Sequence, residues 1–216
     1  MSQSYDSHSA LETLFADLLD EQKKSAKRPP VHLWNPDKSG DMDLRIDREG
    51  RWIHEGSPIR RTALVNLFAT ILKREGDSFF LVSPVEKWQI NVDVAPFFIV
   101  SAEQRLRSGE QAIQLSSITG DQFLIGPNNP LWVDYDNHNQ PLPLVRVRDN
   151  LDGLLSRSVY YQLIDWGHIG CDDDGAQIMQ LRSMGENYLL GPVTSDWEYK
   201  LIHKKGGLES RLFICL

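Results

Sequence analysis

Two adjacent arginines, Arg60 and Arg61, stand near the start of a predicted helix in the stretch GSPIRRTALVNLF. The amino terminus of a helix is the positive end of its dipole and favours acidic side chains. One interpretation of the arginines is a solvated basic face, because exposed arginine is common. The other is an anion site, because free N–H groups attract phosphate or carboxylate and a guanidinium adds a bidentate contact. Both interpretations remain open at the level of sequence.

Other residues could share a pocket with this helix start. Arg45 lies on the polar face of the preceding predicted strand, and His54 directly precedes the expected helix. Ser57 could either cap the helix or contact a ligand. Trp52 is a core residue or a stacking surface, and Lys87, in a predicted loop, is a binding group or half of an exposed charged pair with Glu86. The candidate ligand-binding residues are Arg45, Trp52, His54, Ser57, Arg60, Arg61 and Lys87.

The sequence contains no local catalytic motif. G-x-S-x-G, H-E-x-x-H, a P-loop and G-x-G-x-x-G are all absent, and the six histidines are scattered. A calcium loop beginning at Asp37 fails, because its sixth position is Met42 and its twelfth is Arg48. The run Asp172-Asp173-Asp174-Gly175 is foremost a turn signal. We therefore predict no catalytic residue, metal or cofactor, with an enzyme using His54 or Glu86 as base kept as an alternative.

The charge balance restricts the kinds of partner. The 216 residues include 23 basic and 30 acidic side chains, which gives a net charge of −7. This balance argues against broad binding to nucleic acid or to an anionic membrane, so any anion site must be local. The two cysteines are too few for a disulfide framework and are expected to be free thiols. No apolar stretch resembles a signal peptide or membrane span, so we expect a cytoplasmic protein.

Periodicity predicts the elements that must position these residues. Apolar residues at helical spacing predict an amphipathic helix over 9–24, followed by a polar linker that ends in two prolines. Alternation from Met42 predicts a strand, and Glu49-Gly50 turns it into a hairpin. Ser57 and Pro58 are typical of a helix start. The remainder is rich in short strands, with a second helix over 156–166 and a final hairpin around Gly206-Gly207.

The two predicted helices resemble each other at an offset of 96 residues. Similar residues include Arg61 and Arg157, and Leu67 and Leu163. Upstream of each helix a strand carries arginine between two aliphatic residues, and downstream each helix leads to a hairpin. The unit of strand, helix and hairpin is therefore predicted to occur twice, although chance similarity is the alternative.

A longer set of motifs resembles a known family. GDMDLRIDREGRW, GSPIRRTALVNLF, KREGD, LVSPVEK and APFFIV follow in order between Gly40 and Val100. They resemble the signature of an uncharacterised bacterial family of the domain-of-unknown-function kind. The chain departs from that pattern at Val94, where an acid is expected. The resemblance implies two related α+β halves, the second like a pleckstrin-homology fold, with a ligand pocket between the halves, a nucleotide-like ligand and a role in signal transduction.

Together these observations predict an α+β protein of two related halves, each with antiparallel strands and one helix, the C-terminal half a pleckstrin-homology-like partial barrel. Residues 1–30 form the helix and linker, 31–94 the N-terminal domain and 95–216 the C-terminal domain. The expected function is non-enzymatic binding of an anionic, nucleotide-like small molecule, with no nucleic-acid or membrane partner. An adaptor that binds a protein, or a homodimer, through the N-terminal helix is the alternative from another class.

Overall fold

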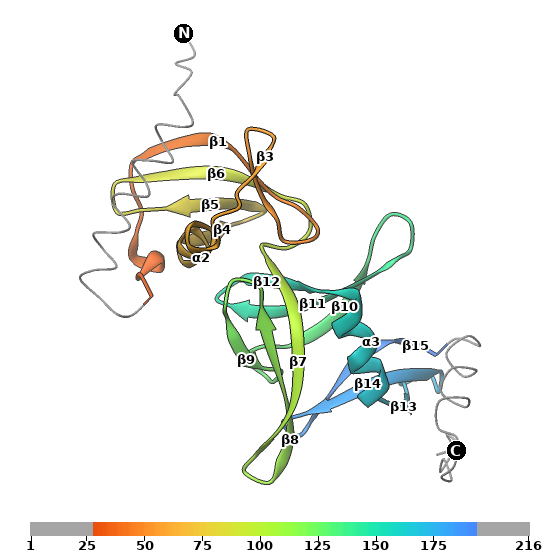
Figure 1. The fold of residues 1–216 in the computed structure, drawn as a ribbon. Helices are drawn as coiled ribbons and strands as arrows, with labels where there is room; N and C mark the ends of the chain where they lie inside the picture. Colours follow the sequence, from red (N-terminus) through yellow and green to blue (C-terminus); the bar gives the residue numbers. More distant parts are fainter. Residues whose placement is uncertain (1–27, 194–216) are drawn as a thin grey trace. The chain divides into compact units, whose positions relative to one another are not determined.

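The computed structural model describes residues 28–193, which form an α+β protein built mainly of antiparallel strands with two α helices (Figure 1). These residues belong to two compact units that divide between Phe97 and Phe98. The helix predicted over 9–24 and the hairpin predicted around Gly206-Gly207 lie outside the described residues. No helix in the described part of the chain is long and apolar enough to cross a membrane.

The described part of the first unit, residues 28–97, contains one six-stranded sheet, one α helix and a short 3-10 helix. Its elements are η1 (Val31–Leu33), β1 (Lys38–Ile46), β2 (Trp52–His54), β3 (Ser57–Pro58), α2 (Thr62–Thr70), β4 (Leu72–Glu75), β5 (Ser78–Val82) and β6 (Glu86–Val92). The strand order is β3-β2-β1-β6-β5-β4. The β1 and β6 strands are parallel, and the other neighbouring strands are antiparallel. A parallel pair of strands needs a long crossover connection. Here the elements from β2 to β5 form the crossover between β1 and β6.

The core of this unit follows from the alternation in β1. Leu44 and Ile46 are fully buried, which confirms the half-buried strand predicted from Met42 onward. Directly paired residues of neighbouring strands point to the same face, so Trp52 lies beside Ile46 on that face. The Trp52 ring packs against Phe68 of α2, with 6.2 Å between ring centroids. The helix therefore covers the apolar face of the sheet through its buried side.

The predicted start of this helix is wrong. Ser57 and Pro58 form the edge strand β3, and α2 begins at Thr62. The reason is the tight turn at Glu55 and Gly56, whose φ values of 48° and 74° suit a two-residue hairpin loop. That turn pairs Ser57 with His54, and an edge strand tolerates Pro58. Ser57 therefore does not cap the helix.

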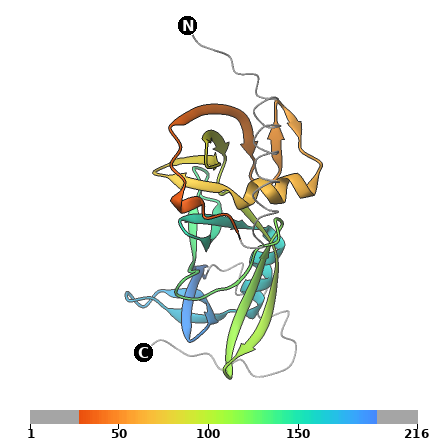
Figure 2. The same cartoon turned by 90° about the vertical axis from the view of Figure 1, so that its left-hand side faces the viewer.

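In the second unit, the described residues up to 193 form a six-stranded sheet that curls into a half-barrel, a separate three-stranded sheet and one helix (Figures 1 and 2). Its elements are β7 (Phe97–Arg107), β8 (Glu110–Ser117), β9 (Gln122–Leu124), β10 (Leu131–Tyr135), β11 (Pro141–Arg148), β12 (Leu151–Leu155), α3 (Arg157–Trp166), β13 (His168–Cys171), β14 (Gln177–Ser183) and β15 (Glu186–Pro192). The large sheet has the order β10-β11-β12-β7-β8-β9, and the small one has the order β13-β14-β15.

The predicted duplication is confirmed. In each unit a helix leads into three consecutive antiparallel strands, β4 to β6 after α2 and β13 to β15 after α3. A hairpin of two strands also precedes each helix in the chain, and both sheets of six strands have a similar build. The two helix starts differ. Ser156 caps α3 by accepting a hydrogen bond from the Val159 N–H, whereas no side chain caps α2.

Several hairpins share one turn scheme. An aspartate at the first position accepts hydrogen bonds from the backbone N–H groups two and four residues later, as Asp47, Asp136 and Asp172 all do. This arrangement satisfies donors that the turn would otherwise leave unpaired. The same arrangement accounts for Asp172 in the acidic run, because its carboxylate accepts hydrogen bonds within the turn between β13 and β14.

One expectation about the cysteines is wrong. Cys171, at the end of β13, is disulfide-bonded rather than a free thiol. The count of two cysteines gave no sign of this bond, because it excludes a framework of several disulfides but not a single one.

Candidate functional site

Five arginines gather at one end of the first sheet, around the turn between β1 and β2. Arg45 lies near the end of β1, and Arg48 and Arg51 belong to the turn. The Ile59 N–H donates to the Trp52 carbonyl over 2.8 Å, so the following residues pass beside the start of β2. We call this set the arginine end. It comprises Arg45, Arg48, Arg51, Arg60 and Arg61.

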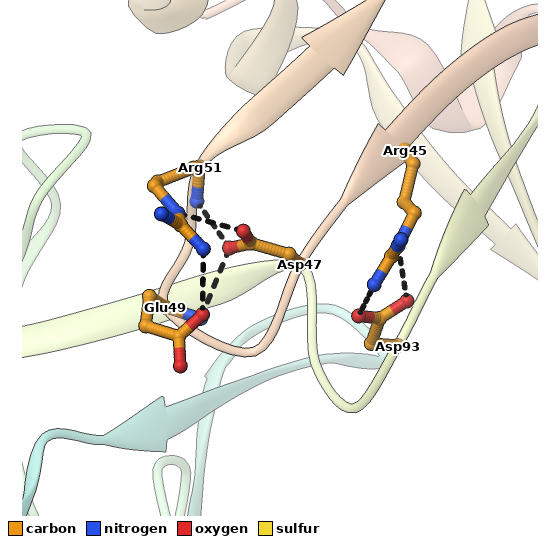
Figure 3. Close-up of polar contacts among 5 residues, drawn as sticks. All are labelled: Arg45, Asp47, Glu49, Arg51 and Asp93. Atoms are coloured by element: carbon orange, nitrogen blue, oxygen red, sulfur yellow. Dashed lines mark hydrogen bonds and ion pairs between the residues drawn. The ribbon is translucent and has the colours of Figure 1, made fainter. Parts of the chain in front are cut away.

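Arg45 is held by Asp93, the residue after β6 (Figure 3). Its Nε and one terminal nitrogen donate to the two carboxylate oxygens over 2.7 and 2.6 Å. The hydrogen bonds and charge of Arg45 lower the pKa of Asp93, and a backbone hydrogen bond from Arg48 adds to this effect. Asp93 in turn raises the pKa of Arg45. Arg45 therefore already has an anionic partner within its own unit.

Arg51 is paired with Asp47 in a different way (Figure 3). The Asp47 side chain is only 4% exposed and accepts from the Arg51 Nε over 2.7 Å. It also accepts the backbone N–H groups of Glu49 and Arg51 over 3.0 and 2.9 Å. Glu49 lies 3.2 Å from the guanidinium of Arg51 on its exposed side. This cluster builds the turn itself, because the buried carboxylate satisfies both backbone donors.

The arginine end contains both paired and exposed guanidinium groups. Those of Arg45 and Arg51 pair with the carboxylates of Asp93, Asp47 and Glu49. Arg60 and Arg61 are both exposed. Arg60 forms no ion pair or hydrogen bond with another residue of the described chain. In a chain whose net charge is −7, the exposed guanidinium group of Arg60 supplies a local positive field that would attract an anion.

The start of α2 adds polar donors to the same place. Arg61 occupies the position before the first helical residue, no side chain caps the helix, and its first turn contains no acid. The first backbone N–H groups of a helix lack acceptors within the helix, and they favour an anion. Arg61 therefore stands at the N-cap, and Arg60 directly before it, instead of in the first turns of the helix as predicted.

The other predicted ligand residues lie elsewhere. Trp52 is only 2% exposed and belongs to the core, so we leave it out of the site. His54 and Ser57 face each other at the far end of the β2–β3 hairpin, next to the turn. The Nε2 atom of His54 is shielded from solvent and has no hydrogen-bond partner in the described structure.

Lys87 is not in a loop, as predicted, but in β6. Its ammonium group lies 2.7 Å from a carboxylate oxygen of Glu75 and 4.8 Å from the centre of the Phe80 ring. Lys87 and Lys73 lower the pKa of Glu75 through hydrogen bonds. Glu86, the alternative base, is buried and lies 2.7 Å from the ammonium group of Lys38. Neither residue belongs to the arginine end.

Sequence reasoning missed four residues of this region. Arg48 and Arg51 lie in the turn motif DREGR, where their closeness to Arg45 could have been read from the predicted hairpin. Asp47 is recognisable as a turn residue. Asp93 could not be found in this way, because it reaches Arg45 through the parallel pairing of β1 with β6, which local patterns do not reveal.

Comparisons with known proteins agree with the two-unit architecture. Residues 29–95 match the family model described as "Domain of unknown function (DUF1285), N-terminal domain", and residues 96–190 match "Protein of unknown function (DUF1285), C-terminal domain". No curated protein matches the chain.

Two solved structures are similar to this chain, and both are described as DUF1285 family proteins. The one from Silicibacter pomeroyi DSS-3 is 41% identical, covers 82% of this chain and 95% of its own, and has a TM-score of 0.71. The one from Shewanella baltica OS155 is 25% identical, covers 57% of this chain and 91% of its own, and has a TM-score of 0.47. The chain belongs to the DUF1285 family, whose N-terminal and C-terminal domains it carries in succession.

Proposed function

We propose that this protein is a non-enzymatic binding module for an anionic small molecule, with its site at the arginine end of the first unit. The observation that carries the proposal is the pair of exposed arginines, Arg60 and Arg61, at the uncapped start of α2 in a chain of net charge −7. Guanidinium groups bind phosphate and carboxylate bidentately, and uncapped helix N–H groups add to that binding.

A phosphate-bearing, nucleotide-like molecule is the ligand class that we favour. Arg60 and Arg61 supply two exposed guanidinium groups next to the uncapped start of α2, which suits a group with more than one negative charge. The motif resemblance between Gly40 and Val100 favours the same ligand class. We further propose that occupancy of the site serves as a signal, because a ligand that prefers one conformation shifts the population toward it.

Thermal shift of the purified protein tests this function. The panel contains nucleoside mono-, di- and triphosphates, cyclic nucleotides, phosphosugars, inorganic pyrophosphate and sulfate. A ligand that binds only the native state stabilises it by mass action, by about 2.7 kcal/mol at a ligand concentration near 100 times Kd. This added stability raises Tm. We expect a saturable shift with at least one phosphate compound.

The matched variants locate the site. Arg60→Ala with Arg61→Ala removes two exposed charges from the arginine end, and the shift should be lost. Arg105→Ala with Arg107→Ala removes two exposed arginines from the β7–β8 hairpin of the second unit and should leave the shift intact. Equal shifts in both double variants would show that the assigned site is wrong.

A further inference from the structure

We draw no further inference here: the strongest candidate, the outer edge of β7 beside the exposed Leu106 on the β7–β8 hairpin, carries no proposal because nothing in the described structure shows what covers it.

Discussion

The two aspartates that pair with arginines at the arginine end have different tasks. Asp47 is buried and organises a turn, whereas Asp93 is half-exposed and holds the Arg45 side chain. Burial decides the difference, because an unsatisfied buried group costs far more than an exposed one. Residue type alone therefore does not show which carboxylate is structural.

Removal of the Asp47 carboxylate should destabilise the protein clearly. Asp47→Ala leaves the backbone N–H groups of Glu49 and Arg51 without their acceptor, and the expected loss is about 1–3 kcal/mol. Asp136→Ala is the control, because the same turn there is exposed and should lose less. Urea denaturation monitored by circular dichroism measures the free energy of unfolding of both variants. A smaller loss for Asp47→Ala than for Asp136→Ala would contradict this account.

The Arg45–Asp93 pair should make stability depend on pH in the acid range. Because the folded state lowers the pKa of Asp93, the stabilisation is present above the ordinary aspartate value, near about 4, and is lost as pH falls through the lowered value. The Tm difference between wild type and Asp93→Asn should therefore shrink as pH is lowered from about 5 to about 2. A difference that stays constant over this range would show that the pair does not stabilise the fold.

At the scale of elements, the sequence predicted those structures that local patterns determine. The strand from Met42, the turn at Glu49-Gly50 and the body of α2 follow from periodicity and turn chemistry. The start of α2 could not be predicted in this way, because Ser57 and Pro58 satisfy the rules of a helix start and of an edge strand equally. Pairing with His54 decided between them, and pairing is not visible in the local pattern.

The candidate site shows the same division. Arg45, Arg60 and Arg61 were found from sequence, because a strand face and an apparent helix start made them conspicuous. Trp52 and Lys87 were assigned to the site by sequence proximity, but packing buries the first against Phe68 and pairs the second with Glu75. Asp93 was missed because the parallel contact of β1 with β6 joins residues 48 positions apart.

The uncapped start of α2 leads to a prediction about stability and binding. Arg61→Ser should stabilise the first unit by roughly 0.5–1 kcal/mol, because serine caps a helix and arginine does not. The same change should weaken binding of a phosphate ligand. Ser156→Ala, at the capped start of α3, should instead destabilise by about 0.5–2 kcal/mol. Urea denaturation and thermal shift measure the two effects, and an Arg61→Ser variant that is less stable would contradict the interpretation.

At the scale of the whole molecule, duplication supplies two helix starts with different chemistry. The second unit satisfies its helix with Ser156, whereas the first leaves its helix uncapped beside an excess of arginine. The net charge of −7 means that anions are repelled from the molecule as a whole. Binding of an anion must therefore depend on the short-range field of the arginine end.

Ionic strength should accordingly control binding. Exposed charges are screened over about 10 Å at 0.1 M salt and about 3 Å at 1 M. The Tm shift produced by a fixed concentration of pyrophosphate should decrease when sodium chloride is raised from about 0.05 to about 0.5 M. Sodium chloride without pyrophosphate is the control for general effects on Tm. A shift that does not depend on salt would indicate binding at an apolar site instead.

The central claim is that the arginine end binds an anion, and one comparison tests it most directly. The measurement is the pyrophosphate-induced change in Tm of the wild type and of the Arg60→Ala, Arg61→Ala double variant, at low salt. Our account predicts a saturable rise in the wild type and none in the double variant. A rise of the same size in both proteins would contradict it.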